Sequence, residues 1–201
     1  NHEIFNSLNI QESDHLILFP ATKKEPSTDQ IDNYKENILK KYQSRLPKAV
    51  IGIGGGSTMD VAKSISVMLC NSGSSKEYQG WDLPKNKGIY KIGIPTIAGS
   101  GSEASRTAVL MGADRKFGIN SDFSMFDAII LDSDLVESVS EDLRFYSGMD
   151  CYIHCVESLE GTMINELSKG IASKALELCS NVFNSNGDND MLITASYLGG
   201  V

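Results

Sequence analysis

The sequence predicts an α/β protein in which a parallel sheet with covering helices is followed by an all-helical part. Short apolar runs alternate with amphipathic helical segments over the first two thirds of the chain, as in sheets whose strands are joined by helices. One apolar run leads directly into three glycines, at residues 54–56, and then into a helix start. From residue 141 onward the periodicity is helical, so we expect two domains, residues 1–137 and 138–201.

In chain order, the first expected elements are a strand, a helix and a second strand. A short apolar run predicts a strand at residues 15–19, and a lysine-rich amphipathic segment predicts a helix over residues 28–42. A second apolar run at residues 49–53 predicts the strand that enters the glycines. Behind the glycines, apolar residues recur at helical spacing and predict a helix over residues 58–69.

After that helix, a long polar loop is expected over residues 71–88. The strand predicted at residues 90–94 ends at Pro95, which cannot donate to a sheet ladder. Two further strands are predicted at residues 107–111 and 128–131. Because the strands alternate with helices, we expect a parallel sheet that binds ligands beyond the carboxyl ends of its strands.

The last third of the chain is expected to be helical. One apolar stripe at helical spacing consists of Ile164, Leu167, Ile171, Ala175, Leu178 and Val182. A polar cluster at residues 184–188 ends this helix, and another helix is expected to begin near Met191.

The composition narrows the expected partners. The 201 residues are 41% hydrophobic, which is enough for a core, and they carry a net charge of -8. Nucleic acids and anionic membranes bind basic faces, so this acidic chain favours small-molecule partners instead. Neither a signal peptide nor a membrane-spanning run is evident, and the four cysteines do not form a disulfide framework, which predicts a cytoplasmic protein. The missing initial methionine and the apolar last residues predict a fragment of a longer protein.

The glycine loop at residues 54–56 is expected to bind an anion. Without side chains in the way, backbone N–H groups and the positive end of the following helix can face a phosphate directly. Ser57 and Asp60 stand at the spacing of a capping box, which predicts a helix start at the end of the glycines. Neither strict nucleotide fingerprint is met, since Ser57 stands where one needs Gly or Ala and no Gly-Lys-Ser/Thr follows. A tight turn without a ligand is therefore the alternative.

A second loop of small residues follows the strand at residues 90–94. The hydroxyls of Thr96, Ser100 and Ser102, with neighbouring backbone amides, can serve a polar ligand. The alternative is a turn capped by Ser100 and Glu103, which again have capping-box spacing. Because two such loops leave adjacent strands, we favour a binding role.

Asp150 and His154 form a candidate metal pair. On a helix, residues four apart share one face, so both side chains can reach one ion. A carboxylate with an imidazole suits Fe(II), Zn, Mn or Co. The alternatives are that Asp150 is only an acid in the first turn of a helix capped by Ser147, and that His154 is a core histidine. Cys151 and Cys155 lie about 100° around the helix from this pair and are expected to pack as small apolar residues.

Together, these three motifs resemble the iron-containing, or group III, alcohol dehydrogenase family. The resemblance covers most of the chain and rests on the order and spacing of residues 53–63, 94–103 and 148–157. It implies a Rossmann-like nucleotide-binding domain followed by an all-helical metal-binding domain of the dehydroquinate synthase-like type, truncated in this chain. It further implies a divalent metal, Fe(II) or Zn, NAD(P) as a cofactor, and a homodimer.

The resemblance also implies roles for individual residues. Those implied to bind the cofactor are Gly55, Gly56, Ser57, Asp60, Thr96, Ser100, Ser102 and Lys116. Lys116 is implied to lie near the ribose, and Asp150 and His154 are implied to be the first two metal ligands. Two further histidine ligands are expected downstream, since His2 and His15 precede the nucleotide-binding segment.

Departures from the family pattern look closest to one subgroup, the 3-deoxy-manno-octulosonate 8-oxidases. They occur at residues 125–127 and 145–147, and residues 78–82 add to the match. This subgroup oxidises the terminal alcohol of an acidic eight-carbon sugar. We hypothesise that Arg106, just after the second loop, binds the carboxylate of such a substrate through its forked guanidinium. A structural ion pair with one of the many acidic residues is the alternative.

The expected function is therefore oxidation of a primary hydroxyl of a polyhydroxylated substrate to an aldehyde. A bound metal lowers the pKa of the hydroxyl and so promotes loss of hydride. The electron acceptor is either NAD(P) or oxygen. The alternatives are an NAD(P)-dependent dehydrogenase of a simple alcohol or polyol, a lyase of the dehydroquinate synthase type, and a non-catalytic nucleotide-binding module.

Overall fold

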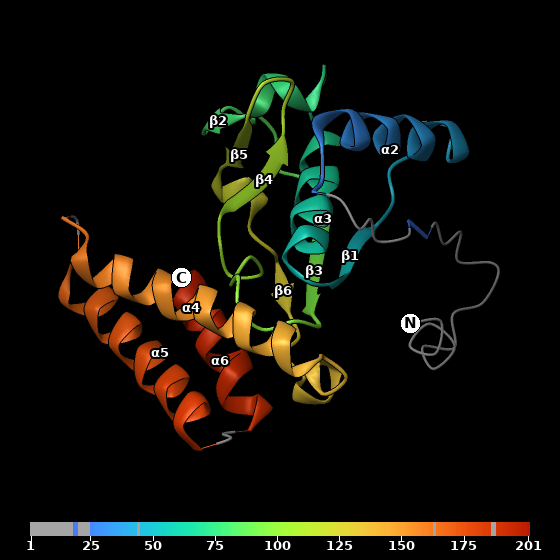
Figure 1. Ribbon diagram of the computed structural model, residues 1–201. Coiled ribbons are helices and arrows are strands. Elements are labelled where there is room, and N and C mark those ends of the chain that lie inside the picture. The colour runs from blue at the N-terminus through green and yellow to red at the C-terminus, as the bar shows by residue number, and fades with distance from the viewer. Residues whose placement is uncertain (1–17, 20–24, 44, 163, 186–187) are drawn as a thin grey trace.

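The computed structural model divides into strands with two covering helices and a separate group of three long helices (Figure 1). It describes residues 18–19, 25–43, 45–162, 164–185 and 188–201. The order of strands and helices confirms the predicted α/β class. Most of the first expected strand, together with His2 and His15, lies outside the described residues.

The main sheet is parallel and has the strand order β1, β3, β6. β1 (Ala49–Gly54) pairs with β3 (Tyr90–Pro95), and β3 pairs with the short β6 (Ala128–Ile129). Gly54 lies opposite Pro95 at the carboxyl ends of β1 and β3, so both strands enter their loops at the same edge of the sheet. β1 and β3 lie where strands were predicted, and β6 is shorter than the strand predicted at residues 128–131.

Helix α3 (Gly56–Met68) is the centre of the α/β part. It lies between the main sheet and the second sheet, and α2 (Thr28–Lys41) covers it from outside (Figure 1). Ile31 of α2 and Met68 of α3 are fully buried in the shared core. α3 presents buried residues on most of its circumference, which explains why this short helix can hold several elements in place.

The second sheet corrects the expectation of parallel pairing for residues 107–111. β4 (Thr107–Met111) forms an antiparallel hairpin with β5 (Lys116–Asn120), and β2 (Gly80–Trp81) pairs parallel to β5. The chain reverses in a tight turn at residues 112–115, where the N–H of Gly112 donates to the carbonyl of Arg115 at 2.8 Å. β5 itself was not predicted, since it is short and Gly118 interrupts its apolar alternation.

The helical part consists of α4 (Glu141–Glu160), α5 (Glu166–Ser185) and α6 (Asn189–Gly200), which pack on one another. Within the predicted stripe of α5, Ala175 is fully buried, whereas Leu167 is 74% exposed. Short 3₁₀ turns occur at Ser75–Tyr78, Asp122–Ser124 and Ser133–Val136. In the part of the chain that the structure describes, no helix is long and apolar enough to cross a membrane. The exact division at residue 137 stays a prediction.

The cysteines of the helical part confirm their predicted packing role. Cys151 and Cys155 of α4 and Cys179 of α5 are fully buried as free thiols, with the sulfurs of Cys151 and Cys179 3.4 Å apart. They share an apolar cluster with Ala175 and Ala195. Contacts among the three thiols and burial raise the pKa of Cys151 far above its ordinary value, so this thiol stays protonated and unreactive.

Candidate functional site

The first loop joins β1 to α3 with an open helix end. Gly55 takes the N-cap position in an extended conformation, and within this described segment no side chain caps the helix. The predicted capping box is therefore wrong, because Ser57 lies inside the first turn, exposed to solvent. The N–H of Thr58 already donates to the carbonyl of Gly55 at 2.9 Å, so the groups of this first turn that can face an anion are those of Gly56 and Ser57. This is the geometry of a phosphate cradle.

The second loop, residues 96–106, lies against this cradle. The N–H of Thr96 donates to the carbonyl of Gly54 at 2.9 Å, which extends the pairing of β1 and β3 into the loops. A Cβ added to Gly56 would lie 2.6 Å from the hydroxyl of Ser100, so the two loops are in contact there. The fold thus brings together Gly55, Gly56, Ser57, Thr96, Ser100 and Ser102, as the sequence predicted, and their binding role stays a prediction.

Asp60 lies at the junction of the two loops, with its carboxylate bound by the protein. It accepts a hydrogen bond from the hydroxyl of Ser102 at 2.7 Å and forms an ion pair with Lys63 at 3.3 Å. Burial raises the pKa of Asp60 above its ordinary value, while Lys63 and Ser102 oppose this shift. In this structure Asp60 therefore joins α3 to the second loop.

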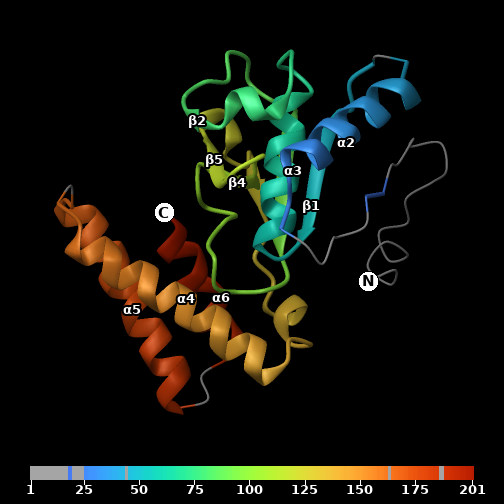
Figure 2. The same ribbon diagram turned by 45° about the horizontal axis from the view of Figure 1, so that its top comes forward.

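Backbone amides of the second loop form hydrogen bonds with the helical part. The N–H groups of Gly99 and Gly101 both donate to the hydroxyl of Ser196 on α6, at 2.7 and 3.3 Å. At Gly99, an added Cβ would clash with the backbone of Ser147 on α4, so the loop also touches the helix of the metal pair. In the turned view of Figure 2 this loop runs between the strands and the helices.

The turn in this loop is not a helix cap formed by Ser100 and Glu103. Instead, the amides of Ala104 and Ser105 both donate to the carbonyl of Gly101, and Glu103 turns inward, only 2% exposed. Burial raises the pKa of Glu103 above its ordinary value, which its own backbone and the nearby Lys63 oppose. The N–H of Ser102 donates to the hydroxyl of Ser100 at 3.3 Å, so the capped-turn alternative is right for Ser100 and wrong for Glu103.

Asp150 and His154 lie on one exposed face of α4. Nε2 of His154 is 3.8 Å from Oδ1 of Asp150. The side chain of His154 is 41% exposed and that of Asp150 is 51% exposed. Both alternatives are wrong: α4 begins at Glu141 with Ser140 as its N-cap, so Asp150 is in the middle of the helix, and His154 is not a core residue. Their spacing suits two ligands of one ion, as predicted, and their binding of a metal stays a prediction. Within the described residues, no cluster contains a third ligand.

The structure separates Lys116 from the two loops. Lys116 is opposite Met111 at the far end of the hairpin, and its ammonium forms an ion pair with Glu25 at 2.9 Å. Thr107, which follows the second loop, is at the other end of β4 from Met111. The four residue steps between them span about 13 Å of strand. The contact of Lys116 with a cofactor ribose stays a prediction.

Arg106 forms ion pairs within the protein. Its guanidinium contacts Asp82 after β2 and lies 3.3 Å from the carboxylate of Asp122. These contacts join the second loop to the second sheet and satisfy its charge with two carboxylates. They support the alternative of a structural ion pair over the substrate-carboxylate hypothesis.

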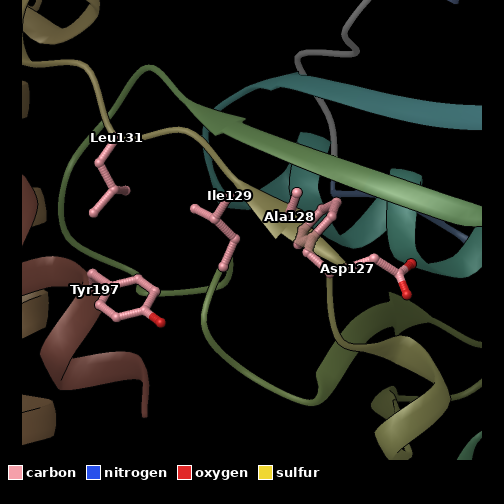
Figure 3. A pocket seen from close by; sticks show the side chains of 6 residues that line it. Asp127, Ala128, Ile129, Leu131 and Tyr197 are labelled. Atoms are coloured by element: carbon pink, nitrogen blue, oxygen red, sulfur yellow. The ribbon is translucent and has the colours of Figure 1, made fainter.

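A pocket of about 370 Å³ lies beside β6, and none of the predicted site residues lines it (Figure 3). Ile129 and Leu131 face it from the strand side, and Tyr197 of α6 faces it from the helical part. Because its lining contains none of the predicted residues, the candidate site rests on the two loops and α4.

Lys63 is a further candidate for a functional residue, and no role was predicted for it from the sequence. It is fully buried on α3, and its ammonium reaches the backbone of the second loop. The available signal was a lysine three residues after Asp60 on an otherwise apolar helix face, a spacing that favours an ion pair.

The fold and the site define a class: a parallel α/β protein with a strand, glycine loop and helix arranged for a phosphate, joined to helices that carry a metal pair. The family model of iron-containing alcohol dehydrogenases matches residues 2–133. The chain belongs to the iron-containing alcohol dehydrogenase family.

Individual relatives agree with this assignment. Over 193 residues the chain is 31% identical to sulfoacetaldehyde reductase of Bilophila wadsworthia, covering 92% of the chain and 49% of the relative. It is 33% identical to long-chain-alcohol dehydrogenase 1 of Geobacillus thermodenitrificans, covering 76% of the chain and 41% of the relative. The chain therefore spans about half the length of these relatives.

Solved structures show the same fold. Sulfoacetaldehyde reductase of Bifidobacterium kashiwanohense, solved in complex with NAD+, superimposes with a TM-score of 0.81 at 25% identity, covering 92% of this chain and 51% of that one. An iron-containing alcohol dehydrogenase of Thermotoga maritima gives a TM-score of 0.80 at 26% identity, with the same coverage. These matches confirm the predicted fold class.

Proposed function

We propose that the chain supplies the nucleotide-binding part and the first two metal ligands of a metal- and NAD(P)-dependent alcohol oxidoreductase that acts on a primary hydroxyl. The observation that carries this proposal is the uncapped start of α3 beside the second loop, which in turn contacts α4, the helix of Asp150 and His154. In this proposal the start of α3 binds a nucleotide phosphate, and α4, which the second loop joins to it, binds the metal ion.

The donor set of α4 fits a divalent metal. A carboxylate and an imidazole on one face of a helix match the ligands that Fe(II) and Zn accept, and their exposure leaves room for further ligands. When bound, such an ion lowers the pKa of an alcohol hydroxyl and so assists hydride loss. The role of Asp150 and His154 is to hold that ion beside the loops.

The start of α3 fits the pyrophosphate of a dinucleotide. The N–H groups of Gly56 and Ser57 favour negative charge, and the absence of a Cβ at Gly56 lets Ser100 of the second loop lie against the start of the helix. The relative from Bifidobacterium, solved with NAD+, supports this choice of cofactor.

For the substrate, the names of the relatives support alcohols and aldehydes, among them long-chain alcohols and sulfoacetaldehyde. An acidic eight-carbon sugar is the narrower candidate from the subgroup resemblance. Its carboxylate was expected to bind Arg106, and the contacts of Arg106 with Asp82 and Asp122 remove that support. The assay therefore compares a neutral primary alcohol, a polyol and the sugar acid.

The test uses the full-length gene product. Metal analysis and oxidation of each substrate are measured with NAD+, with NADP+, and with oxygen alone. We expect bound metal and nucleotide-dependent activity in the wild type, and loss of at least about nine tenths of the metal in Asp150→Ala and in His154→Ala, since each removes a direct ligand.

Glu160→Ala is the matched control, because Glu160 is an exposed acid on the same helix outside the metal pair. It should keep the metal and the activity of the wild type. Unchanged metal occupancy in both ligand variants would contradict the metal site. NAD+ binding without metal or activity would favour the nucleotide-binding module instead.

A further inference from the structure

Lys63 places a cation inside the α/β core, on the helix whose first turn forms the phosphate cradle. Its side chain is 0% exposed, and its only described carboxylate contact is Asp60 at 3.3 Å, one turn earlier on α3. Removing an ammonium from water is costly unless it is paired and fully hydrogen-bonded. A lysine at such a position therefore needs specific partners.

The partners are backbone carbonyls at the end of the second loop. The ammonium donates to the carbonyl of Ser102 at 2.8 Å, to that of Ser105 at 3.4 Å, and to that of Thr107, the first residue of β4. A lysine ammonium has three N–H donors, so these three carbonyls can use all of them. One side chain thus fixes the path of the chain from the loop into the second sheet.

Ser102 forms two hydrogen bonds with side chains of α3. Its carbonyl accepts from Lys63, and its hydroxyl donates to Asp60 at 2.7 Å. Ser102 and its neighbour Ser100 both face Gly56, at the start of α3. The position of the second loop relative to the cradle is consequently set by polar contacts from α3.

We propose that Lys63 is a positioning residue, which fixes residues 102–107 against α3 so that the second loop and the glycine cradle form one nucleotide site. This inference rests on the proposed function. An apolar residue at position 63 can fill the same space, but it leaves three carbonyls without their donor, at a cost for each that exceeds an ordinary hydrogen bond.

The charges around Lys63 agree with this role. Burial lowers the pKa of Lys63, and the carboxylates of Asp60 and Glu103 act against that shift. Asp60 contacts the ammonium directly, and Glu103 acts on it only through its charge, so the loop and the helix each contribute an acid to the same buried region.

The experiment compares Lys63→Met with Lys85→Met in the full-length protein. Methionine keeps the length of the side chain and removes its charge and donors, while Lys85 is an exposed lysine of the loop before β3. Dissociation constants for NAD+ come from titration calorimetry, together with kcat, KM for the alcohol, and metal content. Hydrogen exchange of residues 96–107 is measured in the nucleotide-free protein.

For Lys63→Met we expect the dissociation constant of NAD+ to rise at least about tenfold, equivalent to about 1.4 kcal/mol, with metal content unchanged. Exchange in residues 96–107 should become at least about tenfold faster, while exchange in α5 and all values for Lys85→Met should match the wild type. A merely structural defect lowers nucleotide binding and metal content together. Wild-type affinity and wild-type exchange in Lys63→Met would overturn the proposal.

If Lys63→Met does not fold, Asp60→Asn tests the same contacts. It keeps an acceptor for Ser102 and removes the counter-charge of Lys63, so a smaller rise in loop exchange and in the dissociation constant is expected. Unchanged values overturn the proposal. If the wild type binds neither NAD+ nor NADP+, the proposed function fails, whereas the exchange of the nucleotide-free loop still decides the role of Lys63.

Discussion

The two glycine-rich loops look alike in sequence and differ in how their backbone amides are used. In the first loop, α3 has Gly55 as its N-cap, and no side-chain hydrogen bond caps the start of this helix. In the second, the amides of Gly99 and Gly101 are bound by Ser196, and that of Ser102 is bound by Ser100. The first loop therefore offers its backbone to a ligand, and the second uses its backbone to hold the protein together.

The difference arises from the element that comes after each loop. A helix continues the first loop, and a helix end always leaves several N–H groups without intrahelical partners. A compact turn and β4 continue the second loop, which contacts α3 through Lys63, α4 through Ser147 and α6 through Ser196. In both loops glycine allows close approach of the protein's own elements, since an added Cβ would meet Ser100 at Gly56 and the backbone of Ser147 at Gly99.

The strongest test of this comparison is Gly101→Ala. Gly101 has φ +59°, and an added Cβ would lie 2.6 Å from Cα of Gly200 and from the carbonyl of Ser196. Strain and the clash with backbone atoms of α6 should lower the free energy of unfolding by about 3 kcal/mol, measured by denaturant titration. A stability equal to that of the wild type would show that the second loop is not fastened to α6 in this way.

Gly56→Ala should have the opposite profile in the first loop. Its Cβ meets mainly the hydroxyl of Ser100, which can rotate, and alanine favours a helix, so stability should change by less than about 1 kcal/mol. The methyl group narrows the space for a phosphate, so the dissociation constant of NAD+ should rise about tenfold. Calorimetry of binding and thermal unfolding separate the two effects, and a loss of stability without a loss of affinity would reverse the roles assigned to the loops.

The smallest expected effect concerns Glu103, the buried acid of the second loop. Burial raises its pKa in the folded state, so its contribution to stability is present below the unfolded pKa, near about 4.3, and is lost as the pH rises through the folded pKa. Glu103→Gln removes this titration. The variant should gain stability relative to the wild type as the pH rises from the unfolded pKa through the folded pKa, partly offset by the lost attraction to Lys63. Parallel stability profiles over that range would contradict the buried carboxyl.

Several elements were predictable from the sequence because their signals are local. The apolar run into Gly54 and the helical repeat behind it required only neighbouring residues, as did the shared face of Asp150 and His154. The predicted cap at Ser57 failed because Gly55 adopts the extended cap conformation earlier in the chain than the hydroxyl suggested. A capping pattern gives the region of a helix start but not its first residue.

The remaining features depend on partners far away in the chain. The antiparallel pairing of β4 with β5, the ion pairs of Arg106 with Asp82 and Asp122, and the separation of Lys116 from the loops were not encoded in any short pattern. A lysine or an arginine has the same local signal whether it binds a ligand, a carboxylate or a backbone carbonyl. Only the surrounding fold distinguishes these cases.

By itself, the sequence determined the family, the α/β class, the junction of strand, glycines and helix, and the shared helix face of Asp150 and His154, because strand and helix periods, glycines and a four-residue spacing act within one or two turns of chain. The tertiary structure alone decided which amides stay free and which are used inside the protein. The contact of Ser196 with Gly99 joins residues 97 positions apart. Such contacts form only after the sheet and helices have packed, since their energy depends on burial that no local segment can provide.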